Sequence, residues 1–169
     1  MTESIYNKET KLSRHFTLGE MTKTSHKTAD GNKPSEKVVE NIKRVCKWLE
    51  KLRAEYNKRY AGTGVRGCEG TNAHEYEEPI IINSGYRSPA VNKAVGGAVG
   101  SNHLTGCAAD IRVLGCEQMF RYATILTDIS DESREDFDEL LLERRGSTLW
   151  IHFAVRPSGN RRKMRIICL

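Results

Sequence analysis

One long amphipathic helix restricts most strongly what this chain can fold into. Between about Ser35 and Tyr56, apolar residues recur at spacings of four and three: Val38, Ile42, Val45, Leu49 and Leu52. This spacing places them along one stripe of an α-helix, and Ser35 is a suitable N-cap for it. We interpret the segment as a core-packing helix without chemistry of its own.

Length and composition indicate a single soluble domain. The chain has 169 residues, of which 38% are hydrophobic and 29% charged, and these values are typical of one globular core. It contains no apolar run long enough for a membrane span, and its first residues lack the apolar stretch of a signal peptide. We therefore expect a cytoplasmic location until the protein is released or exported by another route.

The N-terminal region predicts a short helix after a loose segment. Residues 1–14 are polar and are expected to be flexible. Thr17 and Glu20 have the spacing of a capping box, and Phe16 and Met21 stand at the hydrophobic-staple positions. A helix should therefore begin close to Thr17.

The middle of the chain predicts two short strands and a second long helix. Ile80–Ile82 is a β-branched run typical of a buried strand, and residues 108–113 form a second candidate strand with Asp110 near its start. Apolar residues at a spacing of three predict a helix over residues 117–127.

The last part of the chain predicts a hairpin and a final strand. Apolar runs at 137–143 and 149–155 flank the five-residue stretch Arg144–Thr148, a pattern typical of a β-hairpin. Residues 163–169 predict one more strand. The order of elements favours a small single α+β domain over residues 15–169, in which helices flank a mainly antiparallel sheet.

Charge and cysteine content exclude some kinds of partner and site. The net charge is +5, with the basic excess near the C-terminus, which favours anionic partners such as cell-wall polymer or nucleic acid. Nucleic acid is the less favoured of these, because no aromatic-basic motif of a known nucleic-acid module is present. The five cysteines are odd in number and include no CxxC pair, so we expect reduced thiols rather than disulfides or a thiolate zinc site.

Three residues far apart in the sequence form the strongest chemical signal. His103 and Asp110 are seven positions apart among small residues, and His152 interrupts an apolar run far downstream. Two imidazoles and one carboxylate are the usual protein ligands of a catalytic zinc, which acidifies its bound water and polarises a carbonyl. The same residues also fit hydrogen-bonded groups of the core, because this spacing is a weak signal by itself.

Four sequence blocks follow one another along the chain: Ser-Gly-Tyr-Arg-Ser at 84–88, Ser-x-His-x-x-Gly-x-Ala-x-Asp at 101–110, the segment 137–143 and Trp-Ile-His at 150–152. They resemble blocks of the M15 family of zinc peptidases, the D-Ala-D-Ala carboxypeptidase family. Residues 16–20 also resemble the start of the compact, phage-associated branch of this family. The resemblance extends from about Leu12 to Val155 and implies an α+β fold of the hedgehog/D-Ala-D-Ala peptidase kind.

The resemblance also implies a reaction. It implies zinc as cofactor, bound by His103, Asp110 and His152, and peptidoglycan stem peptides with D-amino acids as substrates. We expect the protein to be a monomer. Cleavage would be of the carboxypeptidase or the endopeptidase type. Arg87 would lie beside the metal, where a guanidinium can stabilise an oxyanion or bind a substrate carboxylate. Ser101 would contact substrate or shape its loop.

The general base departs from the family pattern. Relatives carry a Glu three residues before the last His ligand or a His two residues before it, but here Leu149 and Trp150 occupy these positions. Glu143 is the best substitute, provided that the strand register turns it toward His152, and Glu139 is the second choice. Both carboxylates also fit solvated residues of a strand.

These departures leave alternative functions open. The main one is a catalytically impaired module of the same fold that only binds cell-wall peptides. A cysteine peptidase based on Cys107 is less favoured, because it leaves Asp110 and His152 unexplained. Nucleic-acid binding through the basic C-terminal region is also less favoured. Residues 59–78 are longer than the corresponding link in the family and are interpreted as a substrate-shaping loop or a neutral insertion.

Overall fold

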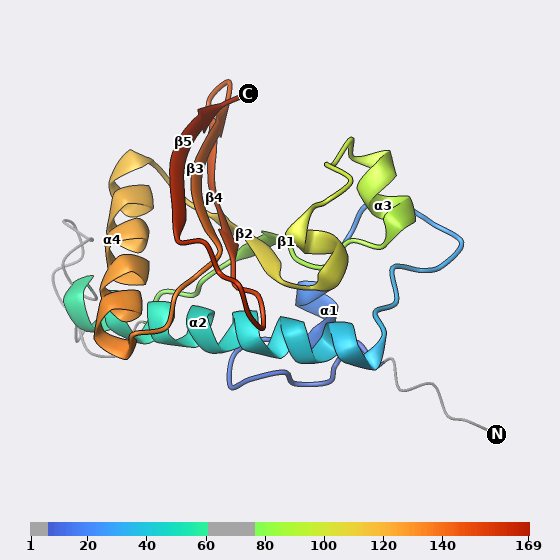
Figure 1. Cartoon of the computed structure of the whole chain (residues 1–169), viewed down its shortest axis with the longest axis horizontal. Coiled ribbons are helices and arrows are strands. Elements are labelled where there is room, and N and C mark those ends of the chain that lie inside the picture. The colour runs from blue at the N-terminus through green and yellow to red at the C-terminus, as the bar shows by residue number, and fades with distance from the viewer. Residues whose placement is uncertain (1–6, 61–76) are drawn as a thin grey trace, which may run out of the picture.

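A computed structural model describes residues 7–60 and 77–169 of the chain. Its elements in chain order are α1 (Leu18–Met21), α2 (Glu36–Tyr60), β1 (Ile82–Ser84), α3 (Pro89–Ala94), the 3-10 helix η1 (Asn102–Thr105), β2 (Ala108–Arg112), α4 (Cys116–Ser133), β3 (Glu139–Arg145), β4 (Thr148–Ala154) and β5 (Lys163–Cys168). They form a small single domain, in which α2 lies beneath the sheet and α4 stands alongside it (Figure 1). The predicted α+β class is confirmed.

The five strands form one mixed sheet in the order β1-β2-β4-β3-β5. Three of the four strand pairs are antiparallel, and only β3 and β5 run parallel. The predicted hairpin is present, but its loop is shorter than expected, because Arg145 already pairs with Thr148. Only Gly146 and Ser147 remain for the turn, and Gly146 adopts a φ of 58°, a conformation that glycine tolerates without strain.

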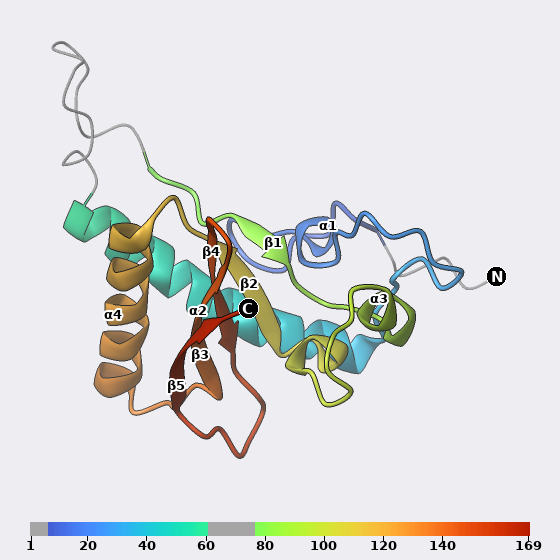
Figure 2. The ribbon, with the colours of Figure 1, turned by 90° about the horizontal axis from the view of Figure 1, so that it is seen from above.

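Alternation along the strands gives the sheet two different faces. One, here called the core face, carries buried apolar side chains from three strands: Ala109, Ile111, Leu140, Ile151 and Phe153. The other, here called the polar face, carries the residues between them, among them Asp110, Glu139, Glu143 and His152. Seen from above, α4 lies on the opposite side of the sheet from η1 and α3 (Figure 2).

The predicted stripe of α2 packs into the core. Ile42, Val45, Leu49 and Leu52 are fully buried. Beside them Trp48 contacts Phe153, with ring centroids 5.4 Å apart. The helix continues to Tyr60, beyond the predicted end. Burial of a continuous apolar stripe is the main source of stability for such a helix, so α2 provides the base on which the sheet rests.

Two predicted elements have different bounds from those expected. The predicted strand Ile80–Ile82 begins later, because Ile80 is buried in the core without pairing and the ladder with β2 starts only at Ile82.

The predicted helix 117–127 is the longer α4. Phe120 points outward on it with 55% of its surface exposed, while Met119, Ala123 and Leu126 are buried. The true stripe of α4 follows 3.6-residue periodicity rather than a strict spacing of three.

The N-terminal capping box is confirmed. The Thr17 hydroxyl accepts a hydrogen bond from the Glu20 backbone N–H, and the Glu20 carboxylate accepts one from the Thr17 N–H at 2.8 Å. Before it, Ser13 donates a hydrogen bond of 2.6 Å to Glu50 of α2.

The predicted flexible segment 1–14 lies partly outside the described residues, and the boundary at residue 15 stays a prediction. Most of the predicted loop 59–78 lies outside them as well.

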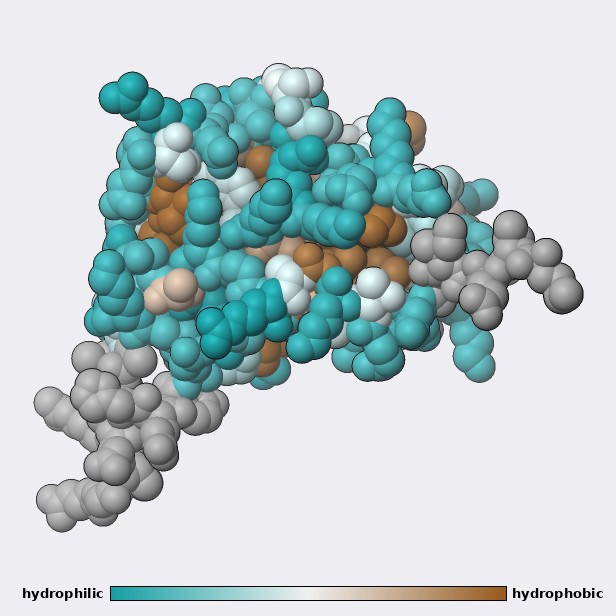
Figure 3. Space-filling view, turned by 90° about the horizontal axis from the view of Figure 1, so that it is seen from below, coloured by the Kyte–Doolittle hydropathy of each residue, from teal (hydrophilic) through white to brown (hydrophobic). Residues whose placement is uncertain are grey.

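The face of the molecule beneath the sheet is mostly hydrophilic (Figure 3). Viewed from below, apolar side chains gather only in limited areas within a largely hydrophilic surface (Figure 3). Within residues 7–60 and 77–169, every helix is too short or too polar to cross a membrane.

Candidate metal centre

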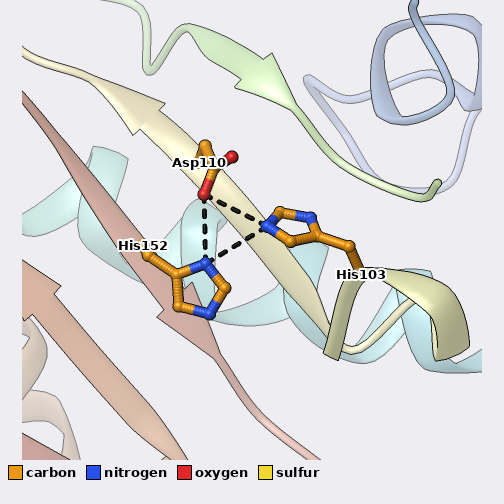
Figure 4. Close-up of side chains that lie close together, drawn as sticks. All are labelled: His103, Asp110 and His152. Carbon is orange, nitrogen blue, oxygen red and sulfur yellow. Dashed lines mark hydrogen bonds and ion pairs between the residues drawn. The ribbon is translucent and has the colours of Figure 1, made fainter. Parts of the chain in front are cut away.

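Three side chains converge on the polar face. Figure 4 shows that His103 in η1, Asp110 on β2 and His152 on β4 point toward one another. His103 Nε2 lies 3.1 Å from His152 Nδ1 and 3.2 Å from Asp110 Oδ1. The third side of the triangle, from His152 Nδ1 to Asp110 Oδ1, is 3.1 Å. All three residues are buried.

This triangle fits a zinc ion. Zinc binds imidazole nitrogen and carboxylate oxygen at about 2.0–2.2 Å in a tetrahedral arrangement, so its ligand atoms stand roughly 3.3 Å apart. The three observed separations, 3.1–3.2 Å, are close to this value. The donor set, two nitrogens and one oxygen, is also that of catalytic rather than purely structural zinc sites. Among the described residues, these three form a cluster of possible metal ligands.

Sheet register and one helix turn bring the three residues together. Asp110 and His152 are directly opposed in the β2–β4 pair, and opposed residues project from the same face of a sheet. His103 reaches them from η1, which ends at Gly106 with a φ of 71°. A side chain at Gly106 would begin 2.8 Å from the Val38 carbonyl oxygen, so only glycine lets this turn approach α2 so closely.

A hydrogen bond at His103 and an ion pair at His152 orient the two imidazoles through their outer ring nitrogens. His103 Nδ1 donates to the Gly85 carbonyl at 2.6 Å, and a carbonyl can only accept, so the Nε2 lone pair faces the cluster. His152 Nε2 lies 3.6 Å from a Glu139 carboxylate oxygen, which leaves His152 Nδ1 facing the cluster. Such outer partners orient metal-binding histidines and raise their basicity.

The electrostatics of the cluster favour a positive charge at its centre. Burial alone would raise the pKa of Asp110, but His103 and His152 bring that pKa well below its ordinary value. Burial alone would lower the pKa of His152, but Asp110 and Glu139 raise it above its ordinary value. A bound cation would meet the same negative surroundings that favour the protonated imidazole.

Comparison with known families agrees with this geometry. Residues 70–134, less than half of the chain, match the model of the Peptidase M15 family. The predicted resemblance to the M15 peptidases is confirmed. The match includes Arg87, Ser101, His103 and Asp110 but ends before β3 and β4. It supports a peptidase, and the cluster supports a metallopeptidase. Among curated proteins, none matches the chain significantly.

Arg87 lies beside the cluster, as the M15 resemblance implies. Its guanidinium is ion-paired with the outer oxygen of Asp110 and donates to the Ser84 hydroxyl at 2.8 Å. Its backbone N–H also donates to the His103 carbonyl. Ser101 caps η1 and accepts a hydrogen bond of 3.3 Å from the His103 N–H. The hydroxyl of Ser101 therefore shapes the loop, and its contact with substrate stays a prediction.

The register also decides which faces the two candidate carboxylates occupy. Leu141 opposes His152, and Glu143, two residues further along β3, opposes Trp150. Because side chains alternate with a period of two, Glu143 shares the polar face with the cluster, as its predicted role requires. Burial raises the pKa of Glu143. The negative charge of Glu143 in turn helps to raise the pKa of His152. Within the described residues, Glu143 forms no ion pair with a lysine or arginine.

Glu139 has a different environment from Glu143. Lys163 lies 2.8 Å and Arg161 3.0 Å from its Oε1 atom, while its Oε2 atom faces His152. These neighbours, His152 first, hold the pKa of Glu139 below its ordinary value. Glu139 is therefore suited to orient His152, and Glu143 is better suited to exchange a proton.

Two buried polar residues that the sequence did not single out hold the site together. Asn32 donates to the carbonyls of Thr22 and Tyr86, at 2.8 and 3.1 Å, and accepts from the Ser88 N–H. It thus clamps the 84–88 turn that carries Arg87. Its only signal in the sequence was a Gly-Asn pair in a polar loop, which is common in turns.

Asp138 is the second of these residues. Its fully buried carboxylate accepts hydrogen bonds from Arg156, Arg161 and Asn102. Burial alone would raise the pKa of Asp138, but these donors hold it well below its ordinary value. Because Asn102 directly precedes His103, Asp138 ties the loop after β4 to η1, which carries His103.

Proposed function

We propose that the protein is a zinc-dependent peptidase that hydrolyses peptide bonds in peptidoglycan stem peptides. The proposal depends mainly on one observation: three ligand atoms 3.1–3.2 Å apart stand on the same sheet face as the half-buried Glu143. The M15 match over residues 70–134 supports the peptidase class. The substrate follows from the sequence resemblance, which implies peptides with D-amino acids.

His103, Asp110 and His152 would hold the zinc ion, which acidifies a water and polarises the scissile carbonyl when bound. Glu143 accepts a proton from the attacking water, because its raised pKa brings it closer to neutral pH than a solvated carboxylate. It then returns the proton to the leaving amine. Such a positioned base contributes about 10²–10⁴-fold to the rate.

Arg87 would stabilise the oxygen that becomes negative. It is anchored by Asp110 and Ser84, which leaves N–H groups of the guanidinium for another acceptor. A donor fixed in advance in a water-poor site is worth more than one that must reorganise. Arg87 can serve in the same way whether the cut releases a terminal residue or opens an internal bond.

A second candidate function is a module that binds cell-wall peptides without cleaving them. The observation in its favour is that Leu149 and Trp150 occupy both positions where relatives carry the base. The peptidase is favoured over this alternative, because Glu143 shares the polar face with the cluster and supplies a carboxylate there.

Metal analysis tests the centre directly. We expect one zinc per purified wild-type molecule, and loss of most zinc in His103→Ala, Asp110→Ala and His152→Ala. His26→Ala is the matched control, because His26 is an exposed histidine of a polar loop and should leave zinc content unchanged. Zinc-free wild type after reconstitution, or full occupancy in the three variants, would contradict the proposal.

Digestion of purified peptidoglycan tests the reaction. Mass spectrometry of the products should show new peptide termini with the zinc-loaded wild type, and the fragment masses identify the scissile bond. The three ligand variants should release none. Zinc-loaded protein that binds peptidoglycan but produces no new termini would instead favour the binding module.

A further inference from the structure

The sheet register places Arg165 of β5 on the polar face, in line with the metal cluster. Asp110 opposes His152 in the β2–β4 pair. Leu141 of β3 opposes both His152 on β4 and Arg165 on β5, and opposed residues project from the same face. Arg165 therefore stands two strands from His152, or about 10 Å between Cα atoms. An extended guanidinium side chain can cover most of this distance.

Arg165 differs from the other cations of this region in having no ion pair within the described residues. Arg87 is ion-paired with a carboxylate of the cluster. Lys163 and Arg161 are ion-paired with Glu139, at 2.8 and 3.0 Å. Arg165 is exposed, and its side chain forms no ion pair or hydrogen bond within residues 7–60 and 77–169. Its charge is thus free to meet a ligand.

One apolar residue, Leu141, separates the cluster from Arg165 across the sheet. Leu141 lies between His152 and Arg165 in the register. It is only 7% exposed, so a peptide bound there would lie over a tightly packed apolar side chain, here called the floor. A peptide carbonyl at the cluster would have its neighbouring atoms over this floor. A small apolar group followed by a carboxylate would match Leu141 and then Arg165. The guanidinium fork is the side chain best shaped for a carboxylate.

We propose that Arg165 binds a carboxylate of the peptide substrate, and that the enzyme thereby prefers anionic stem peptides to their amidated forms. The carboxylate belongs either to the peptide terminus or to an acidic residue of the peptide. This inference rests on the proposed peptidase function, because it requires a peptide seated at the cluster.

Kinetics of Arg165→Gln test the proposal on the full-length, zinc-loaded protein. The probes are synthetic stem peptides in three forms: unmodified, amidated at the C-terminus, or amidated on the acidic side chain. For the unmodified peptide, KM should rise about 10–100-fold, the range expected when a hydrogen bond to a charged group is lost. The kcat should stay within about threefold, because Arg165 does not touch the reacting bond.

The amidated peptides identify which carboxylate is bound. Amidation of the carboxylate that Arg165 binds should raise KM for the wild type and make wild type and Arg165→Gln equal. Amidation of the other carboxylate should leave the difference between the two proteins intact. If Arg165→Gln raises KM equally for all three peptides, the substitution acts without recognising a carboxylate and the proposal is wrong.

Arg112→Gln is the matched control. Arg112 is also exposed and lies on the polar face, opposite Trp150. It lines a separate pocket of about 350 Å³ with Ser147 and Thr148 at the hairpin end of the sheet. Its substitution removes the same charge and should change KM less than about threefold at physiological salt. An equal loss in both variants would overturn the proposal, because a general positive field would then suffice.

The failure of this inference can be told apart from the failure of the proposed function. If the wild type cleaves the peptides and Arg165→Gln behaves identically, only the inference fails. If the wild type cleaves none of them, the proposed function fails, and calorimetric titration with the same peptides tests Arg165 instead. Weaker binding of the unmodified peptide by Arg165→Gln would then support the inference. Equal affinity, or no affinity in the wild type, would overturn it.

Discussion

The two faces of the sheet are built from the same strands but obey different constraints. On the core face, Ile111, Ile151 and Phe153 are fully buried among apolar neighbours. One residue away along the same strands, Asp110 and His152 take part in the metal cluster. The core face is stabilised by volume and contact, whereas the polar face depends on charge and on where each lone pair points.

This comparison teaches that register is the critical quantity in this fold. A slip of one residue between β2 and β4 would exchange the two faces, because side chains alternate with a period of two. The core face resists such a slip, because it would expose Ile151 and Phe153 to water. Packing on one face therefore holds the ligands in place on the other.

The largest effect is expected on the polar face, from Glu143→Gln. The change keeps the size of the side chain but removes the proton acceptor, so kcat should fall about 10²–10⁴-fold. Zinc content should stay at the wild-type value, because Glu143 does not belong to the ligand cluster. Stem-peptide hydrolysis and metal analysis on the same preparation measure both.

Glu132→Gln is the control for this change, because Glu132 is an exposed carboxylate on α4. It should leave kcat within about twofold. A Glu143→Gln enzyme with a kcat close to that of the wild type would show that another group takes the proton.

The next effect is expected on the core face, from Phe153→Ala. Phe153 is fully buried and contacts both Trp48 and Phe137, so the free energy of unfolding should fall by about 3–5 kcal/mol. The milder Ile151→Val should cost about 0.5–1.5 kcal/mol. Urea denaturation measures both, and zinc content of the folded protein should be unchanged. Loss of zinc without loss of stability would contradict the separation of the two faces.

Much of the fold was predictable because local patterns and the tertiary structure agree. The stripe of α2 and the capping box at Thr17 and Glu20 are properties of a few neighbouring residues, and both are confirmed. The hairpin was predicted, but not its two-residue turn. Arg144 and Arg145 look like loop residues in the sequence, and only pairing with β4 makes them strand residues.

The candidate site was predictable only where residue type already implies chemistry. His103, Asp110 and His152 stand out because polar groups in apolar or small surroundings need a partner. Asn32 and Asp138 did not stand out, because their roles depend on carbonyls and guanidinium groups brought together by the fold. The face occupied by Glu143 depended on the register, which the sequence left open.

Asp138 ties the loop after β4 to the turn that carries His103, and its removal should have an intermediate effect. Asp138→Asn leaves Arg156 and Arg161 without their buried acceptor. Both guanidinium groups are partly exposed and can turn to water, so we expect a loss of about 2–3 kcal/mol in the free energy of unfolding, less than for a fully buried pair.

The pH dependence of this loss has a definite sign. The pKa of Asp138 is lowered in the folded protein, so its contribution is complete above the unfolded pKa of about 3.9. It disappears as the pH falls from there toward the folded pKa. The difference between wild type and Asp138→Asn in urea denaturation should therefore be constant from about pH 5 to 8 and shrink below about pH 4. A difference that grows on acidification would refute this account.

The smallest effect separates the two carboxylates of β3. Glu139→Gln removes the charge that faces His152 Nε2, and loss of such an outer partner typically weakens metal binding about 10–100-fold. With zinc in excess, kcat should change little, the opposite of the result expected for Glu143→Gln. Competition with a chelator measures the affinity, and peptide hydrolysis at saturating zinc measures kcat. If Glu139→Gln instead abolished turnover with zinc affinity intact, the two carboxylates would have exchanged roles, and Glu139 would be the proton acceptor of the polar face.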